Sequence, residues 1–380
     1  MSLAFVADQV LLLAAHPRPS EERRARLARL FTSTADWDTV MSLAERHGVA
    51  GLVYDQLHGA PVPPHVRDGL AALARANVAR NLRLRHELSR LLAAFSRSGV
   101  AVLPLKGPVL ADYLYPAPLL RTSGDLDVLV RGDDYTRAVR LVEALGYGPR
   151  PVEEQGADYH TIFTNGVADV ELHHDIGERH VSRMDVEEIW ASATAAQWRG
   201  HPIVAMAPPD QLVYLAFHAA KDGLASLRSL VDIALLVERD RAVLPWAALG
   251  RHLRARPIAP VVYLALSEAR DLLGARVPDE FLDEIRPRHI GWSLAERLFR
   301  WRGGVLHVSD ELLVGPFMAV LMMLWEPTVG ARLRHLRRNL LPSARLRGRW
   351  ASSPARGSLL LAYPQWIMHA ARSLLRQLAT

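Results

Sequence analysis

Two aspartates that alternate with apolar residues constrain this chain more than any other feature. Asp125 and Asp127 stand in the run Asp-Leu-Asp-Val-Leu-Val, which ends at Val130. Residues two apart on a β-strand point to the same side, so both carboxylates share one face and the apolar residues share the other. Adjacent carboxylates are costly to bury without a partner. A magnesium ion would be a natural partner, because it prefers carboxylate and phosphate oxygens. The run therefore predicts a strand at one edge of a packed sheet, with a metal site on its polar face.

Lysine usage singles out two further positions. Of the 46 basic residues, only Lys106 and Lys221 are lysine. Lysine is a compact point charge and arginine a planar fork, so the two are not interchangeable at a charged site. Lys106 and Gly107 follow an expected strand at 100–105. A helix is expected to begin at Pro108, and Gly107 would let a phosphate approach the backbone amides at its start.

A third acid is expected on another strand. An Asn-Gly pair, which is a strong hairpin signal, separates two strand-like runs that end at Thr164 and His173. In the second run Asp169, Glu171 and His173 alternate onto one face. Either acid could complete a three-carboxylate site, and His173 is expected to orient its neighbours.

The pattern along the chain predicts an α+β fold, with a small mixed β-sheet between helical regions. Apolar residues recur with helical spacing over 66–97, and β-branched runs begin at about residue 100. The pattern becomes helical again from Pro208, with Asp210 as the expected N-cap. The expected segments are a helical N-terminal region (1–98), an α/β segment (99–205), a helical region (206–326) and a helical tail (327–380).

Composition excludes several classes of site. Without cysteine, the chain has no disulfide, no thiolate zinc site and no cysteine nucleophile. The longest apolar run, at 312–325, is broken by a Gly-Pro pair and is too short for a membrane span. No basic leader precedes the apolar stretch near the N-terminus. We therefore expect a cytoplasmic protein without a transmembrane segment.

Positive charge is concentrated near the C-terminus. No acidic residue follows Glu326, and ten arginines lie between Pro327 and Thr380. The rest of the chain has 36 basic and 40 acidic residues, from totals of 46 and 40, which gives a net charge of −4. Such a tail can hold nucleic acid, an acidic partner or an anionic membrane surface, and a solvated helical face explains it equally well.

These motifs resemble a family of bacterial nucleotidyltransferase-like proteins in the polymerase-β-like superfamily. The resemblance covers about 37–240 and is most specific in the Arg-x-Ser-Gly-Asp-x-Asp block at 121–127. Its other motifs are Trp37, His47-Gly48-Val49, Lys106-Gly107, Leu114-Tyr115-Pro116, Glu171-Leu-His, His218-Ala-Ala-Lys221 and Asp232. It implies that 99–205 is the nucleotidyltransferase core and that 206–326 closes over a nucleotide.

The resemblance also implies roles for individual residues. The catalytic and metal-binding acids would be Asp125, Asp127 and Glu171. The residues that bind the nucleotide would be Lys106, Gly107, Arg121, Ser123, Gly124 and Lys221. The expected cofactor is Mg²⁺, with Mn²⁺ as the alternative, and a nucleoside triphosphate such as ATP is the expected co-substrate. From the residues alone, Arg121 could equally brace the acids, and a pair between His218 and Asp232 could hold two helices together.

Three functions stay open at this point. The first is transfer of a nucleoside monophosphate from a nucleoside triphosphate to a hydroxyl of a small molecule, a peptide or protein, or an RNA. The second is phosphoryl transfer to a peptide or metabolite on the same fold. The third is a non-catalytic binding protein that retains the fold. Two carboxylates kept on one strand face favour an enzyme, because a site without catalysis has no reason to retain their mutual repulsion.

Overall fold

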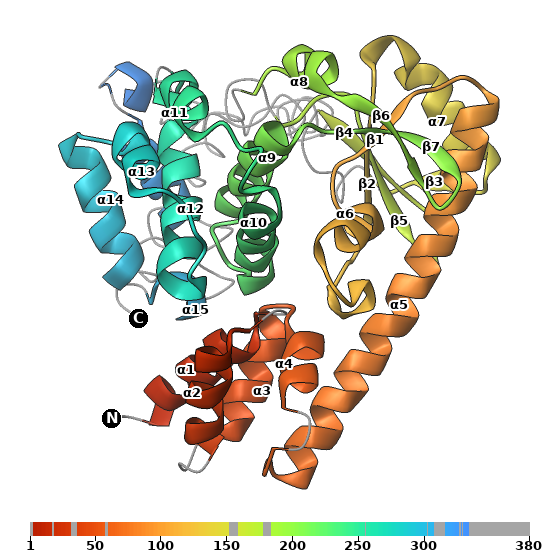
Figure 1. Ribbon diagram of the computed structural model, residues 1–380. Helices are drawn as coiled ribbons and strands as arrows, with labels where there is room; N and C mark the ends of the chain where they lie inside the picture. The colour runs from red at the N-terminus through yellow and green to blue at the C-terminus, as the bar shows by residue number, and fades with distance from the viewer. Residues whose placement is uncertain are drawn as a thin grey trace, which may run out of the picture.

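A five-stranded mixed sheet lies in the middle of the chain, as the sequence predicts (Figure 1). Its strands are β1 (Val102–Pro104), β2 (Leu126–Val130), β3 (Gly148–Pro149), β4 (His160–Thr164) and β5 (Asp169–His173). The spatial order is β1-β2-β5-β4-β3, in which β2 and β5 run parallel and the other neighbouring pairs are antiparallel. The expected α+β class is therefore confirmed.

The computed structural model describes most of the chain up to residue 333. The described residues are 3–16, 19–31, 36–57, 60–151, 159–177, 184–254, 256–301, 303–307, 316–326, 328 and 330–333. Most of the basic tail lies outside them, so the partners expected for that tail stay predictions. Among the helices that are described, none is long and apolar enough to cross a membrane.

Two helices, α5 (Pro64–Arg97) and α7 (Tyr135–Ala144), pack on one face of the sheet. Leu126 and Val128 of β2 lie in the same apolar cluster as Leu88 of α5. These β2 residues are the ones that alternate with the aspartates, and their burial stabilises the strand by roughly 2 kcal/mol per side chain. The polar residues of β2 therefore point to the opposite face, where the site lies.

The β4–β5 hairpin forms for local reasons. Gly166 has a φ of +79°, a conformation that glycine adopts without steric cost. The Asn165 side chain accepts hydrogen bonds from the backbone N–H groups of Val167 and Ala168, each at 2.9 Å. Asparagine favours such turns because its side chain bonds its own backbone. The predicted hairpin is thus confirmed.

A second hairpin is not predicted by the sequence. It consists of β6 (Thr194–Trp198) and β7 (His201–Ala205) and follows the short helix α8 (Val186–Ser192). Both turn residues, Arg199 and Gly200, have positive φ, as a tight two-residue hairpin requires. An arginine in that turn position gives a weak sequence signal, which is why the hairpin escapes a pattern search.

Helices precede and follow the sheet in the sequence. The helices before it are α1 (Leu3–Ala14), α2 (Glu21–Phe31), α3 (Trp37–Arg46), α4 (Ala50–Gln56) and α5. Between strands lie α6 (Gly107–Leu114), α7 and the 3₁₀ turns η1 (Pro118–Leu120) and η2 (Gly132–Asp134). After the sheet come α9 (Pro208–Lys221), α10 (Leu227–Asp240), α11 (Trp246–Arg254), α12 (Ala259–Leu273), α13 (Asp279–Ile285), α14 (Ile290–Trp301), α15 (Gly304–His307) and α17 (Pro316–Trp325).

One apolar core joins the helices that precede the sheet to the helices that follow it. Residues of α1, α3 and α4 lie in the same cluster as residues of α9, α10 and α12, and Figure 1 shows the red N-terminal helices next to this green and cyan group. The N-terminal helices therefore pack on the helices that follow the sheet. The segment boundaries drawn at 98, 205 and 326 remain a proposal.

One expected helix cap is wrong. The helix α9 begins at Pro208, and Ala207 occupies its N-cap position. Asp210 lies inside the first turn, where its carboxylate accepts a hydrogen bond from the Ser192 hydroxyl. Proline is favoured at the first helical position because its missing N–H would have no helical partner there, and this preference outweighs the capping tendency of the later aspartate.

Candidate active site

The register of the two parallel strands brings two acids together. Asp127 on β2 is the partner of Glu171 on β5, and paired residues project from the same face of a sheet. Asp125 lies directly before β2. Asp169 stands two residues earlier on β5 and accepts a hydrogen bond from Arg150 at 2.7 Å instead. Of the two candidate third acids, Glu171 is therefore the one beside Asp127.

His173 completes a cluster with these acids. Its Nε2 lies 3.5 Å from Asp127 Oδ1 and 3.4 Å from Glu171 Oε2. One ligand atom from each of the three residues falls within 4.8 Å of the others. Asp127 Oδ2 and both ring nitrogens of His173 are buried and have no hydrogen-bond partner among the described residues. Buried polar atoms without partners are costly, so this donor set suits a divalent cation.

The two aspartates have opposite pKa shifts. The charge of Asp127, followed by burial, raises the pKa of Asp125 to about 7, against an opposing effect of Lys106. Burial alone would raise the pKa of Asp127, but Lys106 and His173 outweigh it and hold that pKa well below its ordinary value. Two like charges cannot both ionise cheaply at close range. A bound cation would relieve this repulsion.

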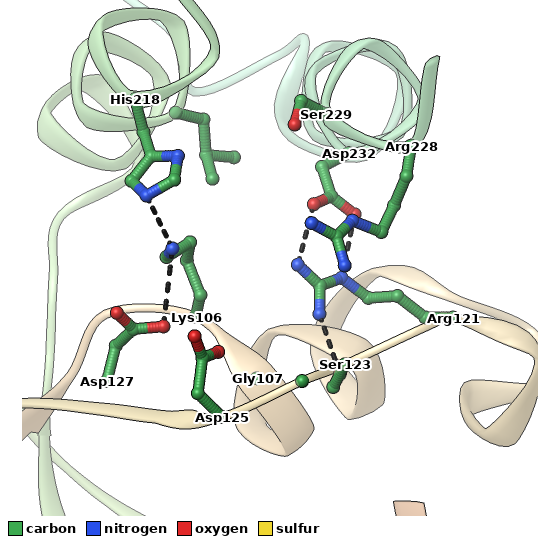
Figure 2. Close-up of a pocket in the computed structure, with 12 residues that line it drawn as sticks. Lys106, Gly107, Arg121, Ser123, Asp125, Asp127, His218, Arg228, Ser229 and Asp232 are labelled. Carbon is green, nitrogen blue, oxygen red and sulfur yellow. Dashed lines mark hydrogen bonds and ion pairs between the residues drawn. The ribbon is translucent and has the colours of Figure 1, made fainter. Parts of the chain in front are cut away.

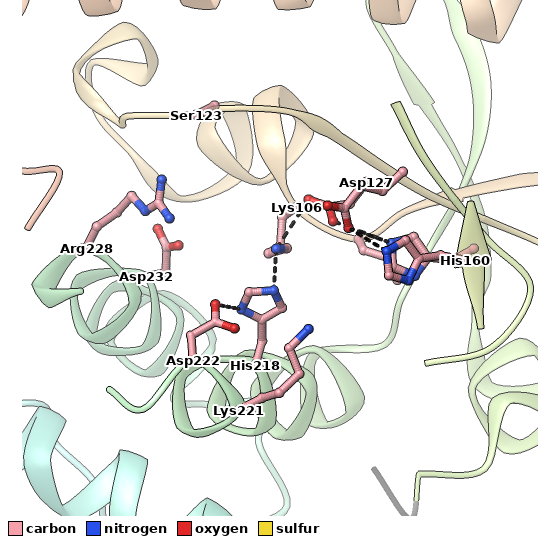
Figure 3. A network of polar contacts seen from close by, with 12 residues as sticks. Lys106, Ser123, Asp127, His160, His218, Lys221, Asp222, Arg228 and Asp232 are labelled. Carbon is pink, nitrogen blue, oxygen red and sulfur yellow. Dashed lines mark hydrogen bonds and ion pairs between the residues drawn. The ribbon is translucent and has the colours of Figure 1, made fainter. Parts of the chain in front are cut away.

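Lys106 connects the acids to the helix α9 (Figure 3). Its Nζ lies 3.3 Å from Asp127 Oδ2 and 2.6 Å from His218 Nε2. Lysine can only donate, so His218 Nε2 accepts and its Nδ1–H is donated to Asp222, 3.0 Å away. Burial and the Lys106 charge lower the pKa of His218, which keeps the ring neutral for this role. The expected His218–Asp232 pair is therefore wrong.

A polar cavity opens beside the aspartates (Figure 2). Its empty space, counting the part open to solvent, is about 390 Å³. Its lining residues are Lys106, Gly107, Arg121, Ser123, Gly124, Asp125, Asp127, Leu215, His218, Arg228, Ser229 and Asp232. All the sequence-predicted site residues except Glu171 and Lys221 line this cavity.

Arg121 braces the site through a buried ion pair. Its guanidinium donates two hydrogen bonds to the Asp232 carboxylate, at 2.9 and 2.8 Å, and a third to Ser123 Oγ at 2.9 Å. Both partners of the ion pair are about 97% buried. The Tyr115 hydroxyl donates to the same carboxylate at 2.7 Å. Between the two interpretations of Arg121, these contacts favour the structural one.

Lys221 does not line this cavity. Its Nζ donates to the Tyr159 hydroxyl at 3.1 Å. Tyr159 is followed by His160, whose ring stacks on His173 with centroids 4.9 Å apart. Burial and then the His173 charge lower the pKa of His160 to about 4. Lys221 thus contacts Tyr159, whose ring lies against those of His160 and His173. It does not line the cavity that Lys106 lines.

Sequence reasoning missed three polar residues of this region. Asp222 follows His218 by four residues on one helix, and that spacing could have indicated the pair. Arg228 and Ser229 line the cavity from the first turn of α10. Arg228 precedes Asp232 by four residues, so helical spacing alone places both on one face. The signal was available, but the choice of face depended on how α10 packs.

We expect Gly107→Ala to lower the free energy of unfolding by about 1–2 kcal/mol, the usual cost of a left-handed conformation for a residue with a Cβ. Gly107 has a φ of +68°. A Cβ there would meet only Asp125 O, at the ordinary contact distance of 3.5 Å, so the cost comes from the backbone conformation and not from crowding. The matched control is Gly124→Ala, because Gly124 has no positive φ and a Cβ there has no described neighbour within 4 Å. Urea unfolding of both variants measures the difference, and equal stabilities would contradict the expectation.

Comparison with protein-family models matches residues 33–274 to a family described as "Uncharacterised nucleotidyltransferase". Among solved structures, the antibiotic-resistance factor ANT(2'')-Ia is similar, with a TM-score of 0.33 and 15% identity over 43% of this chain and 90% of that chain. No curated protein matches the chain. The family match covers more than half of the sequence and includes the sheet and the helices on either side of it. The protein therefore belongs to this family and is an enzyme of the nucleotidyltransferase class.

Proposed function

We propose that the protein transfers a nucleoside monophosphate from a nucleoside triphosphate to a hydroxyl group of an acceptor, in a reaction that depends on Mg²⁺. The observation that carries this proposal is the cluster of Asp127, Glu171 and His173, with Asp125 close enough for the charges of Asp127 and Glu171 to raise its pKa. Asp125 and Asp127 also line a cavity together with Lys106, Arg121 and Arg228. Nucleotidyl transfer needs negative charge to hold a metal and positive charge to hold phosphates in the same small volume. Membership of the family supports the reaction class.

The three carboxylates would hold the metal ion, with Mg²⁺ as the first choice and Mn²⁺ as the alternative. When bound, such an ion neutralises phosphate charge and stabilises the attacking and leaving oxygens of the displacement. Asp127 Oδ2 and the His173 nitrogens fit this proposal, because these buried atoms form no hydrogen bond among the described residues and would gain a partner beside a bound ion. His173 would orient Asp127 and Glu171 and take no direct part in the transfer.

The remaining residues of the site would bind and orient the nucleotide. Lys106 would offer its compact charge to a phosphate, while His218 and Asp222 hold its ammonium group in place. Gly107 and Gly124 line the cavity without a side chain to stand between the backbone and a nucleotide. Lys221 would approach the nucleotide from the side of Tyr159.

Glu171 would accept the proton of the acceptor hydroxyl. Its side chain is 25% exposed, whereas that of Asp127 is 2% exposed, so Glu171 is the carboxylate that an acceptor could reach from solvent. A general base must come within hydrogen-bond distance of the proton that it removes. This difference in exposure supports a division of labour in which Asp125 and Asp127 only hold the metal, while Glu171 helps to hold it and also accepts the proton.

The position of a radioactive label tests the reaction type. Each nucleoside triphosphate, labelled at the α- or the γ-phosphate, is incubated with enzyme, Mg²⁺ or Mn²⁺, and pools of hydroxyl-bearing metabolites, peptides or RNA. The proposal predicts that α-label enters an acceptor and that pyrophosphate is released. Transfer of γ-label would show a phosphotransferase instead, and transfer of neither label from any pool would favour a non-catalytic binding protein.

Metal affinity is expected to fall at low pH. With the pKa of Asp125 raised to about 7, its carboxyl is mostly protonated at pH 6 and mostly ionised at pH 8. Metal binding needs the ionised form and releases the proton. The affinity for Mg²⁺ should therefore be about tenfold weaker at pH 6 than at pH 8.

Calorimetric titration of Mg²⁺ at the two pH values measures this dependence. Asp125→Asn removes the titrating carboxyl and serves as the control, because most of the pH dependence should disappear with it. An identical pH profile in the wild type and in this variant would contradict the assignment.

A further inference from the structure

The cations that line the cavity differ in how fully they are neutralised. Arg121 is paired with Asp232, and Lys106 lies between Asp127 and His218. Arg228 makes no ion pair with any residue in the described part of the chain. Its one side-chain hydrogen bond runs from Nη1 to the Thr122 carbonyl, at 2.8 Å. The cavity therefore contains one guanidinium that forms no ion pair with the described residues.

The donors of Arg228 are also incompletely used. Its Nε is buried and has no hydrogen-bond partner, and its Nη2 donates to none of the residues described here. A guanidinium with free donors is suited to phosphate, which it can contact through two parallel hydrogen bonds. Figure 2 shows Arg228 next to the Arg121–Asp232 pair, at the α10 end of the cavity.

Two hydroxyl groups lie in the same cavity. Ser123 Oγ accepts a hydrogen bond from Arg121, and within the described residues its own proton has no acceptor. Ser229 follows Arg228 and also lines the cavity. Leu215 is the one residue of the lining with a large apolar side chain. This composition suits phosphate groups and does not suit a nucleobase, which binds by stacking on aromatic or apolar surface.

The N-terminal helices fix the position of Arg228. The His47 carbonyl accepts from the backbone N–H of Arg228 at 3.3 Å and from Ser226 Oγ at 3.1 Å. His47 Nδ1 accepts from the N–H of Leu227 at 3.3 Å. Because these backbone groups at the start of α10 already have partners, contact with a phosphate would come from the side chains of Arg228 and Ser229.

We infer that Arg228 and Ser229, with Ser123, form the subsite for the β- and γ-phosphates of the donor nucleotide. This inference rests on the proposed function, which puts the reacting α-phosphate at the aspartates. The other two phosphates then extend along the cavity toward α10, where the guanidinium of Arg228 lies. Lys221 donates to Tyr159 and does not line this cavity, so Arg228, and not Lys221, would contact these two phosphates inside the cavity.

The test compares nucleotides that differ only in the number of phosphates. ATP, GTP, CTP and UTP and the matching monophosphates are titrated calorimetrically with Mg²⁺ into the wild type, Arg228→Gln and Arg228→Lys. We expect Arg228→Gln to weaken triphosphate binding roughly ten- to hundredfold, the usual effect of losing charged hydrogen bonds. Monophosphate affinity should stay unchanged. Arg228→Lys should recover part of the loss, because lysine keeps the charge and lacks the fork.

The control is Arg241→Gln. Arg241 is exposed and directly follows α10, so this variant should bind all nucleotides like the wild type. Equal triphosphate affinity in Arg228→Gln and the wild type would overturn the inference. An equal loss for mono- and triphosphates would also overturn it, because that pattern indicates a structural defect. A wild type that binds no nucleotide under any condition would instead contradict the proposed function, and this inference with it.

Discussion

Asp127→Asn should lower nucleotidyl transfer by at least about a hundredfold, the scale of effect seen when one preorganised charge is removed from a reaction centre. Asp127 is the most enclosed of the three acids and contacts both Lys106 and His173. Its pKa lies well below the ordinary value, so the native carboxylate is fully charged at neutral pH. Asparagine keeps the shape and loses that charge. Label transfer from the α-phosphate measures the effect.

Asp169→Asn is the matched control for this variant. Asp169 is an acid of β5 that alternates with Glu171, and its carboxylate is paired with Arg150 away from the cavity. Its side chain is 33% exposed, and loss of a partly exposed ion pair has a small effect on stability. Activity near that of the wild type is expected. An Asp127→Asn enzyme as active as Asp169→Asn would show that the reaction occurs elsewhere.

Asp232→Ala should lower the free energy of unfolding by about 3–5 kcal/mol. The change leaves the buried guanidinium of Arg121 without its carboxylate, and an unpaired buried charge carries a penalty of that size. The Tyr115 hydroxyl loses its acceptor as well. Urea unfolding at equilibrium measures the loss. The double variant Arg121→Met/Asp232→Leu should be more stable than Asp232→Ala, because it removes both charges and fills the space with apolar groups.

An exposed ion pair provides the comparison. Arg270 and Asp279 form a pair at 2.7 Å whose side chains are 36% and 84% exposed, and Asp279→Ala should cost less than about 1 kcal/mol. A similar small cost for Asp232→Ala would show that the Arg121 contact contributes little. In that case the interpretation of Arg121 as the brace of the site would be wrong.

Local patterns predicted the strands and the hairpin that carry the acids. The alternation of aspartates with apolar residues indicated the two faces of β2, and the Asn-Gly turn indicated where the hairpin leads into β5. Both signals arise within a few residues, so tertiary contacts change them little. The long helix α5 was predicted for the same reason, since its apolar stripe is local. The β6–β7 hairpin was missed because its turn contains Arg199, a residue without a strong turn preference.

Partner choice in the site was harder to predict than residue type. The sequence indicated Lys106, Arg121, His218 and Asp232 as functional or structural residues, but it paired His218 with Asp232. In the structure α9 directs His218 to Lys106, and α10 directs Asp232 to Arg121. Such pairings depend on how two helices pack against the sheet, and helical spacing alone does not contain that information. Arg228 was missed for the same reason.

The choice between Asp169 and Glu171 shows which part of the site local sequence patterns cannot predict. Alternation places both acids on one face of β5, and the residues themselves give no preference. The parallel register with β2 decides, because it sets Glu171 beside Asp127. Register between strands far apart in sequence follows from the packing of the whole sheet.

Calorimetric titration of the four nucleoside triphosphates, with and without Mg²⁺, tests the central claim most directly. The wild type is compared with the double variant Asp125→Asn/Asp127→Asn. We predict that the wild type binds at least one triphosphate only when Mg²⁺ is present, and that the double variant loses this binding while it melts cooperatively. Binding that is independent of Mg²⁺, or that persists in the double variant, would contradict a metal-dependent transferase site at these two aspartates.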